Sequence, residues 1–230
     1  MITMRVLFLF VITTMTTVVI GCEDGVLNFP QPAPASIRIV NVTQDVASLS
    51  VVIDGNITLL SKRGQVSADM GVPAGRRISL VFRDGDNVIG RDTLRQTFGG
   101  GAQLILFAKG TKTNIVDFRQ AIQDTTVTGS PMAFVRFTHM SDYFDKAGFA
   151  ELWFEGGQKV FDNIFEPGIS SRDYTQLVPG IYSFVLREEG TGVELSRLNN
   201  VNLSAGASYM IFSYDAAPPI VDSIALDIFN

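Results

Sequence analysis

The sequence predicts an all-β protein with two tandem antiparallel β-sandwich domains, which follow a signal peptide and a proline-rich stalk. After residue 35, short runs in which apolar and polar residues alternate fill the chain, as expected of half-buried strands. Turn residues, Asp-Gly pairs among them, separate these runs at intervals of roughly 8–12 residues. The order of the runs in the first half recurs in the second half at an offset of about 98–105 residues.

Residues 1–21 are predicted to be a cleaved signal peptide. Arg5 is the only charged residue before Glu23, and an apolar stretch of about 16 residues runs from Val6 to Gly21. As a helix this stretch would be only ~24 Å long, which is shorter than the ~30 Å hydrocarbon core of a membrane. A basic start, an apolar centre and a small residue at the end are typical of secretory signals.

Cys22, the only cysteine, directly follows the apolar stretch. The tetrapeptide Val19-Ile20-Gly21-Cys22 resembles a bacterial lipobox. The resemblance implies that the chain is cleaved between Gly21 and Cys22, and that the thiol of Cys22 carries a diacylglycerol. Several acyl chains would anchor the protein stably in a membrane. The alternatives are an ordinary secretory signal with a free Cys22 and a short buried helix.

Residues 22–35 are predicted to be the lipid anchor and a linker, in which Pro30, Pro32 and Pro34 favour an extended conformation. The exported chain has no cysteine besides Cys22, so its domains form without disulfides and depend on hydrophobic cores. The net charge is −5 and basic runs are absent, which argues against nucleic acid as a partner.

The first domain is predicted to span residues 36–122. In the run SIRIVNV, Ile37 and Ile39 lie on one side, and the run ASLSVVIDGN ends in an Asp54-Gly55 turn. A second hairpin has its tip at residues 84–87, and the runs AQLILFAKG and TNIVDF complete the set. The next segment, FRQAIQD, is predicted to form one helical turn at most.

The second domain is predicted to span residues 132–230, after a linker at residues 123–131. AFVRFTH matches SIRIVN, and AELWFEGG matches LSVVIDGN. LVPGIYSFVL and AGASYMIFSYD match GVPAGRRISLVF and GGAQLILFAKG. About seven strands in each domain favour a sandwich over an up-and-down barrel. A single fused sandwich is the alternative.

The stretch IRIVNVTQDVASLSVVIDGN, followed by VPAG, resembles the domain-of-unknown-function family 4397, which is bacterial, exported and often tandem. The resemblance implies an immunoglobulin-like β-sandwich, and the family has no established activity to carry over. In the first half the motif positions are Asn41, Thr43, Asp45, Asp54 and Gly55. In the second half the nearest matches are His139, Ser141, Asp142, Glu155 and Gly156, although Asp142 falls one residue early and both halves lack the motif's proline.

Residues that could carry chemistry are sparse. His139, the only histidine, would need partners to act as a base or a metal ligand, and its counterpart Asn41 cannot perform the same proton chemistry. Both side chains can instead accept a hydrogen bond from the following turn. Asp84 and Asp86 have the spacing of two calcium-loop ligands, but the loop's glycine and glutamate are missing. We therefore predict no catalytic residue, no metal and no cofactor, and a protein that is not an enzyme.

Trp153 in ELWFE is the main candidate for contact with a ligand or partner. Alternation places Leu152 and Phe154 on the core side and Trp153 on the outer face, between two glutamates. An exposed tryptophan at this position could stack on a sugar ring or seat a protein partner. It could equally cover the sheet or pack against the first domain. Nearby loop aromatics add to this surface, namely Tyr143, Phe144 and Phe149.

These observations predict a non-enzymatic lipoprotein of the bacterial cell envelope. It is expected to be exported and anchored through lipid on Cys22 in the outer membrane, on the periplasmic or the surface side. Its role would be binding or structural, with protein or glycan partners. The alternatives are a carbohydrate-binding lipoprotein that uses Trp153 and nearby loop aromatics, and an accessory subunit of an envelope assembly.

Overall fold

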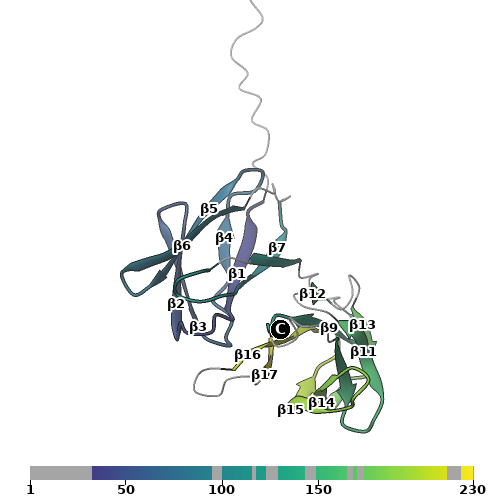
Figure 1. Ribbon diagram of the computed structural model, residues 1–230. Helices are drawn as coiled ribbons and strands as arrows, with labels where there is room; N and C mark the ends of the chain where they lie inside the picture. Colours follow the sequence, from purple (N-terminus) through teal and green to yellow (C-terminus); the bar gives the residue numbers. More distant parts are fainter. Residues whose placement is uncertain are drawn as a thin grey trace, which may run out of the picture. The chain divides into compact units, whose positions relative to one another are not determined.

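The computed structural model describes residues 33–94, 100–115, 118–122, 129–142, 149–164, 168–169, 174–216 and 224–229. Within these residues all regular structure is β, which confirms the predicted all-β fold (Figure 1). Residues 33–230 form one compact unit. The predicted signal peptide and lipidation site, Gly21 and Cys22 included, lie outside the described residues.

The first half of the fold, residues 35–122, contains two sheets that enclose a hydrophobic core. One sheet has the order β4-β1-β7-β8 and the other the order β3-β2-β5-β6. Alternate residues of both sheets point into the core, where Phe82, Leu49 and Ile37 are fully buried. The strands are β1 (Ala35–Asn41), β2 (Ser48–Ile53), β3 (Ile57–Lys62), β4 (Met70–Val72), β5 (Ile78–Asp84), β6 (Asn87–Leu94), β7 (Gln103–Ala108) and β8 (Phe118–Ile122).

The second half, residues 133–229, repeats this architecture around a core of its own. Its sheets have the orders β12-β9-β16-β17, with β13 also paired to β9, and β11-β10-β14-β15. Phe137, Leu152 and Phe184 are fully buried in this second core. The strands are β9 (Ala133–His139), β10 (Ala150–Phe154), β11 (Lys159–Ile164), β12 (Gly168–Ile169), β13 (Thr175–Leu177), β14 (Gly180–Glu188), β15 (Glu194–Leu203), β16 (Ser208–Asp215) and β17 (Ile224–Phe229).

The repeat seen in the sequence extends to the register of the strands. In the first half β1 pairs with β7, with Ile37 opposite Leu104, and in the second half β9 pairs with β16, with Val135 opposite Tyr209. Both of these pairs are parallel, whereas the prediction was of antiparallel sheets. The chain can make a parallel pair because several intervening strands carry it back to the starting edge of the sheet. The other strand pairs of the two halves are antiparallel.

The structure contains the predicted Asp54-Gly55 turn, but it has a strand where one helical turn at most was expected. The Asp54-Gly55 turn is present, and both residues have positive φ (50° and 77°), as a type I′ turn requires. The segment FRQAIQD does not begin with a helical turn, because Phe118–Ile122 forms β8 and pairs with β7 along its whole length. Tertiary pairing therefore overrides the weak local preference of this segment. Residues 123–128 of the predicted linker lie outside the described residues.

Candidate functional site

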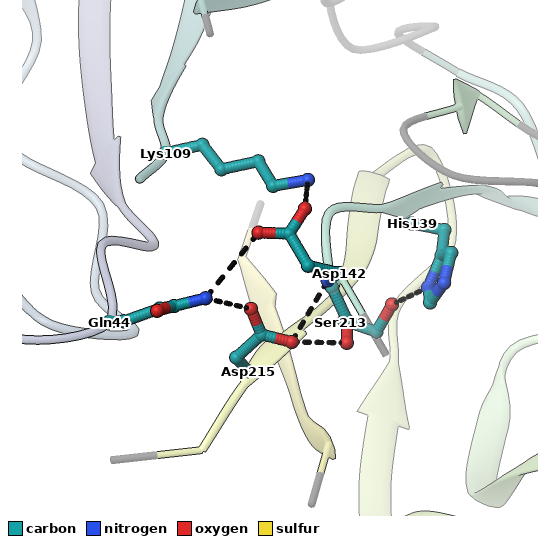
Figure 2. A network of polar contacts seen from close by, with 7 residues as sticks. Gln44, Lys109, His139, Asp142, Ser213 and Asp215 are labelled. Carbon is teal, nitrogen blue, oxygen red and sulfur yellow. Dashed lines mark hydrogen bonds and ion pairs between the residues drawn. The ribbon is translucent and has the colours of Figure 1, made fainter. Parts of the chain in front are cut away.

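A group of polar contacts joins the two halves, and we name it the junction cluster. It lies where β1, β7, β9 and β16 end (Figure 2). The Gln44 amide nitrogen donates to carboxylate oxygens of Asp142 (3.4 Å) and Asp215 (3.0 Å). The Lys109 ammonium forms an ion pair with Asp142. The members of the junction cluster are Gln44, Arg63, Lys109, Ser141, Asp142 and Asp215.

Asp215 is the acceptor at the centre of the junction cluster. One of its carboxylate oxygens accepts bonds from the Ser141 hydroxyl (2.5 Å) and the Asp142 amide (3.0 Å). Its backbone carbonyl accepts from the Arg63 guanidinium at 2.5 Å, and the same guanidinium donates to the carbonyl of Gln44. Burial lowers the pKa of Arg63 from its usual value, although Tyr214 and Asp215 oppose this effect. These bonds tie the ends of strands from both halves together.

An apolar junction core adjoins the junction cluster. It includes Phe107, whose ring centroid is 5.7 Å from that of Phe212 in an edge-to-face arrangement. Tyr214 packs against this core, and its hydroxyl lies directly over Gly64. The buried members of the junction core are Val40, Val42, Ile105, Phe107, Met140, Met210, Phe212 and Phe229.

His139 is completely buried, which leaves no room for a substrate at its ring. Its Nδ1 pairs with the Ser213 hydroxyl on β16. Burial, followed by the positive charge of Lys109, lowers its pKa to about 3, so the ring is neutral near pH 7. The expected bond to the following turn is seen at Asn41, whose side-chain oxygen accepts from the Thr43 amide (3.1 Å) and hydroxyl (2.7 Å).

Trp153 lies on the outer face of its sheet, but its ring is engaged by neighbouring side chains. Its Nε1 donates to Glu151 at 3.0 Å, and Glu151 is only 6% exposed. The Lys159 ammonium lies 5.3 Å and the Arg187 guanidinium 5.1 Å from the ring centroid. Its cross-strand neighbour Val185 is fully buried. In this arrangement Trp153 covers the outer face of the sheet.

The other candidate aromatics are only partly described. Phe149 precedes β10 and is 40% exposed, while Tyr143 and Phe144 lie outside the described residues. Two more exposed apolar side chains, Val178 and Ile181, lie near the start of β14. The predicted contact surface of Trp153, Tyr143, Phe144 and Phe149 therefore stays a prediction.

Asp84, at the hairpin tip with calcium-like spacing, forms an ion pair with Lys112 at 2.7 Å. Among the described residues, no group of three or more histidine, cysteine, aspartate or glutamate side chains is placed to hold a metal ion. The described part of the chain also contains no helix that is long and apolar enough to span a membrane.

Sequence reasoning identified His139 and Asp142 as motif positions but missed the junction cluster as a unit. One signal was present. Val40 on β1, and Val42 just after it, face away from the core of the first half and are apolar. On β7, Phe107 also faces away from that core. A strand that is apolar on both sides is typical of a sheet that is buried on both faces.

Comparison with known proteins identifies no family for this chain. No protein-family model matches it, and no curated protein matches its sequence. The Bacillus anthracis TIE protein matches 77% of this chain at 12% identity and a TM-score of 0.25, and this chain spans about a third (33%) of that protein's length.

Two further solved structures match most of their own length. One is a candidate polysaccharide-binding protein of Bacteroides thetaiotaomicron, from domain-of-unknown-function family 1812, which is matched over 79% of this chain and 92% of that chain at 11% identity and a TM-score of 0.22. The other is a family 26 module from Eubacterium rectale Amy13K, solved with maltoheptaose, which is matched over 85% and 95% at 9% identity and a TM-score of 0.25. TM-scores this low carry no argument about this chain.

Proposed function

We propose that this protein is a non-enzymatic, lipid-anchored module of the bacterial cell envelope. In this proposal its two β-sandwiches act as one body that offers outer surfaces to a protein or glycan partner. The non-enzymatic part rests on one observation: the side chains that could carry chemistry are buried or bonded within the fold. His139 is fully buried, and Lys109, Asp142 and Asp215 bond across the junction between the halves.

Physical chemistry supports a structural role for these groups. A general base needs access to the proton that it removes, and its pKa should lie near the working pH. The His139 ring has no exposed surface, and its pKa is lowered to about 3. Lys109 is 5% exposed, and its charge is balanced by Asp142. Groups held in this way fix one geometry of the junction.

The anchoring part of the proposal rests on the sequence before the first strand. Gly21 and Cys22 end an apolar stretch in a lipobox-like motif. Three alternating prolines follow, and the first strand begins at Ala35. A segment of this composition acts as a semi-rigid spacer, at ~3.1 Å per residue in an extended conformation. The order of anchor, spacer and folded body suits a protein that is held at a membrane surface.

Lipidation can be tested directly in bacterial cells. Mass spectrometry of the purified protein should find a chain that begins at Cys22, with a diacylglycerol on its sulfur and an acyl chain on its amino group. The matched control is Cys22→Ser, which should leave the fold intact but move the protein from the membrane fraction to the soluble fraction. An unmodified Cys22 thiol in a chain that retains residues 1–21 would refute the anchoring.

Partner contact needs a separate experiment on intact cells. Crosslinking followed by purification should recover one dominant protein partner if the module belongs to an envelope assembly. Glycan-array binding by the exported chain that is lost in Trp153→Ala, at unchanged stability, would instead establish the carbohydrate-binding alternative. Turnover of a substrate that depends on His139 would overturn the non-enzymatic proposal, whatever the outcome of the lipidation test.

A further inference from the structure

The two halves meet through equivalent faces of their repeats. The register places Ser36 opposite Gln103 in the first half and Phe134 opposite Ser208 in the second half. These pairs correspond at offsets of 98 and 105 residues, which carry Val42 onto Met140, Ile105 onto Met210 and Phe107 onto Phe212. All six of these residues belong to the junction core. The two halves therefore contribute equivalent faces of the repeat to the junction.

Two contacts across the junction join a residue to its own equivalent. Phe107 packs edge to face on Phe212, and Gln44 bonds to Asp142, which is its equivalent at the offset of 98. A residue meets its own equivalent only near a twofold axis. The junction is therefore isologous in type, like the interface of a symmetric homodimer, and its surfaces are self-complementary.

The charges around the junction core break this symmetry and select unlike halves. Lys109 of the first half has Tyr214 as its equivalent, while Asp142 has Gln44. In a pairing of two first halves, Lys109 would lose its acidic partner. In a pairing of two second halves, the positions that join Gln44 to Asp142 would bring two Asp142 carboxylates together, and like charges repel. Only a junction between a first half and a second half gives both Lys109 and Asp142 a partner of opposite charge.

We propose that this face also binds a second copy of the chain, through a reciprocal exchange of halves. The first half of each chain packs on the second half of the other, so that both junctions of the dimer reproduce the junction within one chain. Exchange of an identical element is a low-cost route to a closed dimer. Ten residues, 123–132, separate β8 from β9, and when extended they span about 33–36 Å. The proposal does not depend on the lipid anchor.

The experiment uses two complementary charge reversals in the exported chain, with Cys22→Ser so that no lipid is attached. Lys109→Asp places two acids at the junction of a single chain, and Asp142→Lys places two lysines there. In each variant alone, like charges therefore destabilise the junction within a single chain. When the two variants are mixed, exchange restores an opposite-charge pair at both junctions. We expect native mass spectrometry to find at least about tenfold more heterodimer in the mixture than dimer in either variant alone.

Controls separate exchange from misfolding. The chain that carries both reversals should fold and should match the unreversed chain in its fraction of dimer, because the opposite-charge pair is restored within it. Circular dichroism should show native β content in each single variant.

If a single variant does not fold, a second experiment uses the unreversed chain, which is refolded from denaturant over about a hundredfold range of concentration. A dimer whose fraction rises with concentration and that persists on dilution supports exchange. Monomer at every concentration, or a mixture with no heterodimer from folded variants, overturns it.

Discussion

Phe107 of β7 and Phe212 of β16 pack edge to face, with ring centroids 5.7 Å apart and ring planes inclined at 60°. Neither ring is more than 1% exposed. The two residues are equivalent positions of the repeat and come from different halves, so their contact buries aromatic surface where the halves meet. This pair belongs to the apolar junction core, which adjoins the junction cluster.

Removal of one ring of this pair should destabilise the protein strongly. Phe107→Ala leaves a cavity in a fully buried site, and we expect it to lower the free energy of unfolding by about 3–5 kcal/mol. Val88→Ala, at a position that is 43% exposed, is the matched control and should cost within about 0.5 kcal/mol. Denaturant titration measures both values. A cost below about 1 kcal/mol for Phe107→Ala would mean that the junction core does not form in solution.

His139 should make stability depend on pH. Its pKa is lowered to about 3 in the folded protein, whereas the unfolded chain titrates near the ordinary value of 6.5. Between these values the unfolded state binds the proton and the folded state does not, so stability falls as the pH falls.

We therefore expect the unmodified chain to lose about 2 kcal/mol more than His139→Asn between pH 7 and pH 5. Asparagine is the residue at the equivalent position 41, which makes this substitution the matched control. Parallel stability curves for the two chains over this range would contradict the buried, neutral histidine.

Much of the fold could be predicted from local pattern, because each half obeys period-two alternation. Ile37, Ile39, Leu49 and Val51 point into the first core, as their spacing indicated. The turn at Asp54 and Gly55 was also readable, since few residue pairs accept positive φ twice in succession. These features depend on residues that are neighbours in the chain.

The junction could not be predicted in the same way, because it depends on contacts between distant residues. Gln44 and Asp215 are 171 positions apart, and nothing near Gln44 in the sequence indicates that its amide will meet a carboxylate. The parallel pairing of β1 with β7 is likewise a matter of topology. Trp153 was placed on the outer face by alternation, but its two cationic neighbours come from β11 and β14.

Gly64 should tolerate no side chain. Its φ is +70°, and a Cβ there would collide with the Tyr214 hydroxyl. Gly85→Ala is the matched control, because Gly85 has a φ of +59° and open space around it. We expect Gly85→Ala to cost about 1–2 kcal/mol from the left-handed backbone alone, and Gly64→Ala to cost about 1–3 kcal/mol more from the collision. Equal costs in denaturant titrations would show that Tyr214 does not pack on Gly64.

Trp153 should act on stability more than on binding. Its ring covers buried Val185, and its Nε1 satisfies nearly buried Glu151. We expect Trp153→Ala to lower the free energy of unfolding by about 1–3 kcal/mol through lost burial. Leu60→Ala, at a side chain that is 67% exposed on β3, should cost less than about 0.5 kcal/mol. Unchanged stability together with lost glycan retention would refute the covering role and favour a sugar site.

A double-mutant cycle on Lys109 and Asp142 tests the union of the two halves most directly. Each single change, Lys109→Met or Asp142→Asn, removes one member of an ion pair in which the Lys109 side chain is buried and the Asp142 side chain is partly exposed. The free energies of unfolding of the four chains then isolate the interaction between the two side chains. We predict a coupling of at least about 1 kcal/mol, since the two residues are in contact across the junction. Single effects that simply add, within about 0.3 kcal/mol, would show that the two halves are not joined at this junction.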